Sequence, residues 1–193
     1  MSKKLPVVLD LETKYTFREF PDHKNLGVSV VAVYDYAEGR SHAFIEKDIS
    51  KLFPILERSS YIVGFNVQSF DLPVLGTYYP GSIAHFETFD ILEDIRSKLG
   101  RRLALNDLLN ATLGKRKSGH GLMAIDYYKE GKIEELIRYC IDDVMLTKDI
   151  FDYGVKFGEV FYLNERGKNQ IKVDWKKYLE DAGKKETPLT LPF

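Results

Sequence analysis

The chain has 193 residues, 44% of them hydrophobic and 30% charged, and its formal net charge is −1. These values are typical of one well-buried soluble domain. They exclude a protein that binds nucleic acid through a strongly basic overall charge. No apolar run is long enough to span a membrane, no signal peptide precedes the first apolar stretch, and the single Cys140 excludes an internal disulfide. We therefore expect a cytoplasmic protein in a reducing compartment, with no membrane partner.

The first third of the sequence predicts three strands and a helix. Short runs rich in Val, Ile and Leu predict the strands, at 5–9, 26–36 and 39–46. A polar loop separates the first of these runs from the second. Residues 48–60 carry apolar side chains at helical spacing, so we expect a helix capped by Asp48, with Pro54 inside it.

The rest of the chain alternates helices with two further strands and ends in a hairpin. Apolar runs predict these strands at 61–66 and 85–90. Helical spacing predicts helices at 69–79, 91–100, 104–114, 122–131 and 132–158. A hairpin with Gly167 in its turn is expected at 161–175. This order predicts an α/β fold with a mixed sheet of about five strands and helices on both sides.

Two acidic residues stand at the end of the first strand. Because side chains in a strand alternate between faces, Asp10 and Glu12 share a face with Val8, while Leu9 and Leu11 take the other. Two carboxylates this close repel each other and are costly to remove from water. A divalent cation would turn the repulsion into coordination. The alternative is a solvated strand end with two ordinary acids.

Asn66 and Asp71 lie at the junction between the fourth strand and the following helix. Both residue types are common caps at helix N-termini, which gives them an ordinary structural explanation. Open α/β sheets, however, bind ligands outside the carboxyl ends of their strands. We therefore expect Asn66 and Asp71 to lie at the same sheet edge as Asp10 and Glu12.

The helix at 132–158 separates two neighbouring acids. Each residue of a helix advances about 100°, so its apolar residues form one stripe, made of Ile133, Leu136, Ile137, Cys140, Ile141 and Val144. Asp142 lies far from this stripe, in solvent, where it can pair with Arg138. Asp143 lies at the edge of the stripe, on the face of Tyr139. An inward Asp143 needs a partner such as a metal ion; a peripheral surface acid is the alternative. Cys140 is expected as a small buried hydrophobic residue.

Together these segments contain three motifs, D-x-E, N-x-x-x-F/Y-D and Y-x-x-x-D. They correspond to Asp10 and Glu12, then Asn66, Phe70 and Asp71, then Tyr139 and Asp143. In order and spacing they resemble the DEDDy branch of the DnaQ-like 3′–5′ exonucleases, and they look most similar to family-B-polymerase-like exonuclease domains. The match covers about residues 7–150. It implies a ribonuclease-H-like fold in a single domain, 1–193, with the motifs in a part of about 5–155 and a C-terminal hairpin and tail of about 158–193.

The resemblance also implies a site with two Mg²⁺ or Mn²⁺ ions. Asp10 would bridge both ions, Glu12 and Asp143 would complete the shell of the first, and Asp71 would hold the second, partly through water. Such hard oxygen ligands suit these ions, and two ions can neutralise charge on the attacking and leaving oxygens of a phosphodiester. Tyr139 would orient the attacking water, because a tyrosine pKa near 10 makes it a poor base.

The implied reaction releases 5′-mononucleotides from a single-stranded 3′ end, with DNA favoured and RNA left open. The expected substrate-binding residues are Thr13, Asn66, Phe70, Arg101, Arg102, Lys115, Arg116, Lys117 and His120. The basic residues among them flank the helix at 104–114 and could form one patch along the phosphate backbone; a solvated charged face is the alternative. Phe17 and Phe20 follow the acid pair in a loop, where they either separate bases or serve packing alone.

Two other functions are also compatible with the sequence. One is a non-catalytic nucleic-acid-binding or scaffold domain of the same fold, which would normally have lost one of the acids. The other is a structure-specific endonuclease, against which the Y-x-x-x-D motif argues. A polymerase or a helicase acting in trans is a candidate partner, and proofreading, DNA repair and RNA processing are all compatible with the sequence.

Overall fold

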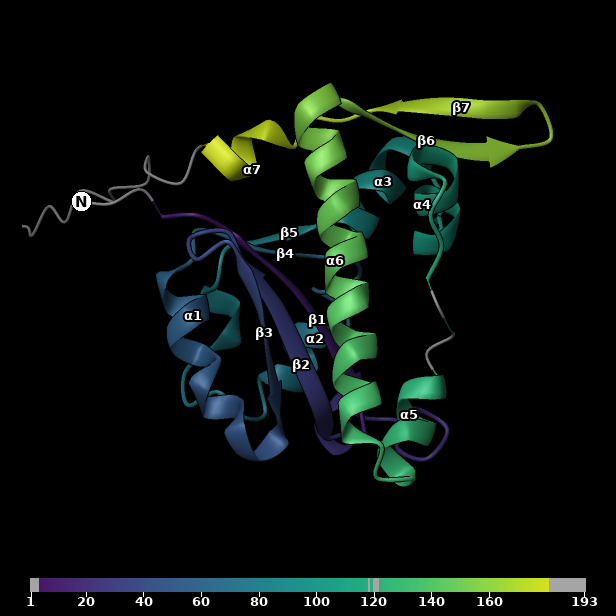
Figure 1. Cartoon of the computed structure of the whole chain (residues 1–193). Coiled ribbons are helices and arrows are strands. Elements are labelled where there is room, and N and C mark those ends of the chain that lie inside the picture. The colour runs from purple at the N-terminus through teal and green to yellow at the C-terminus, as the bar shows by residue number, and fades with distance from the viewer. Residues whose placement is uncertain (1–3, 118, 120–121, 181–193) are drawn as a thin grey trace, which may run out of the picture.

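A five-stranded mixed sheet forms the centre of the molecule (Figure 1). The computed structural model describes residues 4–117, 119 and 122–180. In spatial order the strands are β3 (Arg40–Ile45), β2 (Val28–Asp35), β1 (Val7–Thr13), β4 (Ile62–Gly64) and β5 (Thr88–Asp90). β1 pairs antiparallel with β2 and parallel with β4. The mixed sheet of five strands agrees with the predicted α/β architecture.

The two faces of the sheet are covered by different helices. On one face lie α3 (Ile91–Leu99), α4 (Leu105–Leu113), α5 (Leu122–Lys129) and the long α6 (Ile133–Phe157). On the other lie the 3₁₀ helices η1 (His23–Asn25), η2 (Glu46–Lys51) and η3 (Ile83–His85), with α1 (Phe53–Arg58) and α2 (Asp71–Leu75). No helix in the described ranges is long and apolar enough to cross a membrane.

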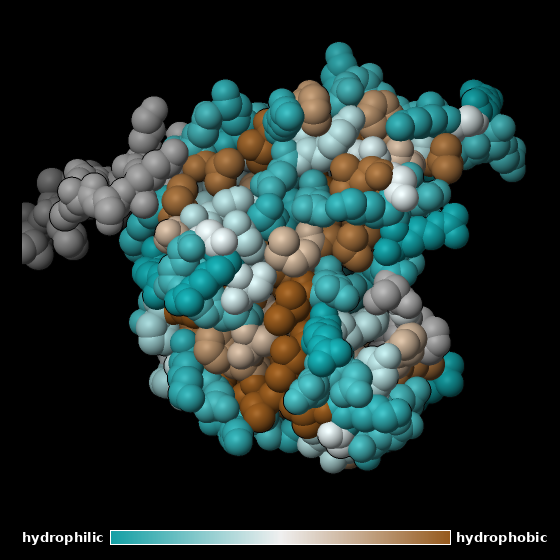
Figure 2. Space-filling model, in the orientation of Figure 1, coloured by the Kyte–Doolittle hydropathy of each residue, from teal (hydrophilic) through white to brown (hydrophobic). Residues whose placement is uncertain are grey.

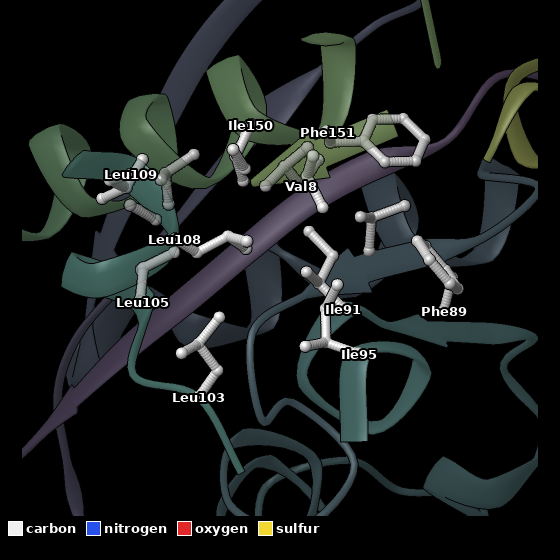
Figure 3. Close-up of a cluster of buried hydrophobic side chains, with 14 of the residues drawn as sticks. Val8, Phe89, Ile91, Ile95, Leu103, Leu105, Leu108, Leu109, Ile150 and Phe151 are labelled. Atoms are coloured by element: carbon white, nitrogen blue, oxygen red, sulfur yellow. The ribbon is translucent and has the colours of Figure 1, made fainter. Parts of the chain in front are cut away.

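The alternation of β1 separates two hydrophobic cores. Val8 packs on the α6 side, whereas Leu9 and Leu11 are buried in the core beneath α1 and α2. Figure 3 shows Val8 among side chains of α3, α4 and α6, including Ile150 and Phe151. The predicted facing of the strand is therefore confirmed, and Asp10 and Glu12 point to the α6 side with Val8.

The C-terminal segment belongs to the same core. It consists of β6 (Glu159–Asn164), β7 (Gly167–Lys172) and α7 (Lys176–Glu180). Trp175 is fully buried, stacks on Phe151, and donates its indole N–H to Asp94 at 2.8 Å. A Cβ on Gly154 would lie 2.0 Å from the Trp175 ring, so only glycine fits there. The hydrophobic core therefore includes side chains of this segment, and residues 181–193 of the predicted tail lie outside the described part.

Two predicted helices differ from the observed ones. The expected helix at 48–60 is divided into η2 and α1 around Leu52, because Pro54 has no N–H to donate and its ring clashes with the preceding turn. Asp48 does not cap it and instead binds Lys51 at 2.6 Å. The helix expected at 69–79 is shorter, since α2 covers only Asp71–Leu75.

Candidate metal centre

β1 and α6 bring three acidic side chains together. One carboxylate oxygen each of Asp10, Glu12 and Asp143 lies within 4.8 Å of the other two. The contact between the two elements is close, since Cys140 Sγ lies 3.5 Å from the Asp10 carbonyl oxygen, to which it donates. Cys140 itself is buried, as the sequence predicts. Residues 133 positions apart thus form one acidic cluster.

The α6 register matches the sequence prediction at this point. Asp143 is only 1% exposed and Tyr139 4%, whereas Asp142 faces solvent. The expected pairing of Asp142 with Arg138 is wrong, because the Arg138 guanidinium lies 3.3 Å from Glu134, one turn before it. The helix therefore turns Asp143 into the cluster and leaves its neighbour in water.

The fourth acid reaches the cluster from α2. Asp71 is buried, and its Oδ1 accepts the backbone N–H of Leu11 at 3.0 Å. Leu11 stands between Asp10 and Glu12, so this bond fastens α2 to the part of β1 that carries the acid pair. The Asp71 side chain therefore does not cap α2, as the alternative suggested, but connects α2 to β1.

Burial makes the four carboxylates hard to ionise together. It raises the pKa of Asp10 to about 7, an increase that Lys117 opposes and Asp143 adds to. Burial, followed by the charge of Asp10, raises the pKa values of Glu12 and Asp71 well above their ordinary values. The pKa of Asp143 is also raised, mainly by burial, against the opposing charge of Lys117. A cluster with these pKa values gains stability from a bound cation.

Lys117 supplies a positive charge inside the cluster. Its Nζ lies 2.6 Å from Asp143 Oδ2, and its side chain is only 23% exposed. Burial alone would lower the lysine pKa, but Asp10 and Asp143 outweigh it and raise that pKa. The sequence places Lys117 with Lys115 and Arg116 in an outer patch, whereas the structure turns it inward.

The donor set fits Mg²⁺ or Mn²⁺. The three-carboxylate group contains no cysteine or histidine, and hard oxygen ligands are those that these ions prefer. The Tyr139 hydroxyl is buried beside Asp143 without a hydrogen bond of good geometry, so it is available to a water molecule or a phosphate oxygen. Asp10, Glu12, Asp71 and Asp143 are the residues that would hold the ions.

Asp90 supports the site, and sequence analysis missed it. This buried residue ends β5, and its carboxylate accepts the backbone N–H groups of Asn66 at 2.9 Å and Gln68 at 3.0 Å. It also accepts the N–H of Leu92 at the start of α3. Asn66 has a φ of 71°, an uncommon conformation for a residue other than glycine. Asp90 therefore fixes the loop that leads to Asp71. Its position at the end of a strand and before a helix is the one feature of the sequence that could have pointed to it.

An aromatic group lies beside Asp71. The ring centroids of Phe17 and Phe70 are 5.8 Å apart, and His23 contacts both rings from η1. Phe17 is 45% exposed, and Tyr15 and Phe20 on the same loop are also exposed. Exposed rings at this position form a surface on which a base can stack.

The other predicted substrate residues are dispersed. Arg102 donates to the Asn66 side chain at 2.9 Å, and Arg101 lies over the Tyr162 ring. Lys115 pairs with Asp149, and Arg116 lies 3.5 Å from the Asn110 side chain. The Thr13 hydroxyl is occupied by the Tyr15 carbonyl at 2.8 Å. His120 lies outside the described residues.

Comparisons with known proteins confirm the predicted ribonuclease-H-like fold class. The model of the RNase H superfamily matches residues 7–155, so the chain belongs to this superfamily. A solved family B DNA polymerase from the hyperthermophilic archaeon Pyrobaculum calidifontis is similar, with a TM-score of 0.63 and 18% identity over 81% of this chain. The match spans 25% of the polymerase chain. No curated protein matches.

Proposed function

We propose that this protein is a metal-dependent 3′–5′ exonuclease that releases 5′-mononucleotides from single-stranded 3′ ends, with DNA favoured over RNA. The observation that carries the proposal is the convergence of Asp10, Glu12, Asp71 and Asp143, from three separate segments, beside the buried Tyr139 hydroxyl. A non-catalytic domain would have no use for this cluster, whose ionisation is unfavourable without a cation.

The chain's own groups have separable tasks in this reaction. Two Mg²⁺ or Mn²⁺ ions, when bound by the four acids, would stabilise charge on the attacking and leaving oxygens of a phosphodiester. Burial and the charge of Asp143 raise the pKa of Tyr139 above its ordinary value. Tyr139 therefore stays protonated and positions the attacking water through a hydrogen bond, without acting as a base.

Recognition of a strand end follows from the surroundings of the acids. Phe17 and Phe70 present ring surfaces next to Asp71, and these can stack on the terminal base. The Arg102 guanidinium on Asn66 offers a positive charge to the adjacent phosphate. The fold shared with a DNA polymerase supports DNA as the substrate, and a polymerase or helicase acting in trans is the partner we propose.

Labelled oligonucleotides test the proposal. A 5′-labelled single strand should give a descending ladder with Mg²⁺ and none with EDTA, and a 3′-phosphate should slow it. Matched DNA and RNA strands, digested side by side, decide the substrate. Immediate release of the label as a mononucleotide would mean the opposite polarity, and cleavage of a circular strand would mean an endonuclease.

A further inference from the structure

The hairpin of β6 and β7 projects from the body of the molecule, beyond α4 (Figure 1). Its base is fixed, because Val160 and Ile171 are buried and the Phe161 N–H donates to the Thr112 hydroxyl of α4 at 2.9 Å. Residues 163–168, which include the turn, are exposed. A hairpin with a fixed base and an exposed turn is suited to contact another molecule.

Cations lie over aromatic rings on this hairpin. The Lys168 ammonium is 4.3 Å from the centre of the Phe161 ring, and the Arg101 guanidinium is 5.3 Å from that of Tyr162. Leu163, which pairs with Lys168 across the hairpin, is 52% exposed. Aromatic rings accompanied by basic groups are the usual elements of a surface for single-stranded nucleic acid.

The basic side chains of this region are also free of carboxylate partners. Among the described residues, no acid lies within ion-pair distance of Arg101, Arg102, Arg166, Lys168 or Lys172. On neighbouring α3, by contrast, Arg96 and Lys98 are both paired. Cations without a carboxylate partner can replace the counterions of phosphates without first breaking an ion pair within the protein. Figure 2 shows a largely hydrophilic surface over the projecting hairpin, interrupted by a few hydrophobic side chains.

Two adjacent arginines connect the loop that leads to Asp71 with the hairpin. Arg102 contacts Asn66, five residues before Asp71, and the adjacent Arg101 contacts Tyr162 of β6. We propose that the β6–β7 hairpin is a second binding surface for the nucleic-acid substrate, and that it holds the strand several nucleotides away from the end being cleaved. The proposal rests on the nuclease function proposed above and adds a contact region outside the metal centre.

The test removes the three hairpin charges together, in an Arg166→Ala, Lys168→Ala, Lys172→Ala variant. All three side chains are exposed, so the melting temperature should be unchanged. Binding of fluorescent 4- and 20-nucleotide single strands is measured in EDTA by anisotropy at several salt concentrations. We expect the 20-mer to bind at least about 10-fold more weakly, with a salt slope smaller by about 2 for three lost phosphate contacts, and the 4-mer to bind as to wild type.

A matched variant separates the hairpin from a general effect of charge. Lys4→Ala, Lys47→Ala, Lys51→Ala removes three charges near η2 and α1, across the sheet from α6, and it should leave both affinities unchanged. The proposal is overturned if the two variants lose the same affinity for the 20-mer, or if the hairpin variant binds the 20-mer like wild type. In either case the hairpin would instead be a candidate surface for a protein partner. Wild type that degrades strands but binds both lengths equally overturns this inference alone. Wild type that neither binds nor degrades them overturns the proposed function as well.

Discussion

Asp142 and Asp143 are adjacent acids with opposite surroundings, which makes them a matched pair for mutation. Asp143→Asn removes a cluster carboxylate and should abolish turnover while the fold remains. Asp142→Asn changes a solvent-facing group and should keep nearly full activity, with stability within about 0.5 kcal/mol of wild type. Tyr139→Phe should reduce kcat by about 10²–10⁴-fold, because it removes only the positioning hydroxyl. Single-turnover kinetics on the three variants decide this, and an inactive Asp142→Asn would mean that the third motif is misassigned.

Protons and metal ions compete for the acidic cluster. The folded-state pKa of Asp10, about 7, lies above its ordinary value of 3.8, so the folded protein binds this proton more tightly than the unfolded chain. The associated stability is present below about pH 4 and is lost as pH rises through 7. In EDTA the melting temperature should therefore fall between pH 5 and pH 8. Mg²⁺ or Mn²⁺ should raise it more at pH 8, and less in Asp10→Asn. A melting temperature indifferent to both ions at pH 8 would contradict the metal centre.

Lys117 offsets part of the cluster's negative charge. Lys117→Met leaves Asp143 buried without its ion-pair partner and should lower the stability of the metal-free protein by about 1–3 kcal/mol. Lys115→Met, two residues earlier, breaks only the exposed pair with Asp149 and should cost less than about 1 kcal/mol. Urea unfolding in EDTA compares the two variants. Equal stability losses would show that the inward lysine has no special role.

Among the connecting elements, the loop from β4 to α2 depends on Asp90. Asp90→Ala removes the acceptor of the Asn66 and Gln68 N–H groups, so Asp71 should shift and kcat should fall by about 10²-fold, as small displacements of reacting groups typically cause. Asp90→Asn keeps one carbonyl oxygen and should recover part of this loss. Asp107→Ala, an exposed acid on α4, is the control. Loss of stability with normal kcat and normal Mg²⁺ affinity would limit Asp90 to a packing role.

The periodic elements explain which parts of the site the sequence could predict. Strand alternation placed Asp10 and Glu12 on one face, and helical spacing distinguished Asp143 from Asp142. Lys117 and Asp90 act through a loop and a strand end, and nothing in a local pattern relates Lys117 to Asp143 or Asp90 to Asn66. The segment 48–60 is divided because Pro54 distorts one helical turn. The sequence shows that Pro54 can shorten or bend a helix, but not where the helix is interrupted.

At the scale of the whole molecule, the C-terminal segment stabilises the domain. Trp175 fills the space above Gly154 and stacks on Phe151, so Trp175→Ala should lower the free energy of unfolding by about 3–5 kcal/mol. The neighbouring Lys177→Ala, on exposed α7, should change it by less than about 0.5 kcal/mol. Thermal unfolding of both variants measures the difference. A Trp175→Ala protein as stable as wild type would show that the domain ends near residue 157.

The spacing of the acids along the chain has a consequence for biosynthesis. Asp10 and Glu12 leave the ribosome first, Asp71 follows, and Asp143 emerges only with the helix that packs across β1. Until that helix docks, Asp10 and Glu12 remain exposed to water and lack Asp143, the third member of the group of carboxylates that lies within 4.8 Å. A nascent or prematurely terminated chain that lacks α6 would therefore carry an incomplete acidic cluster.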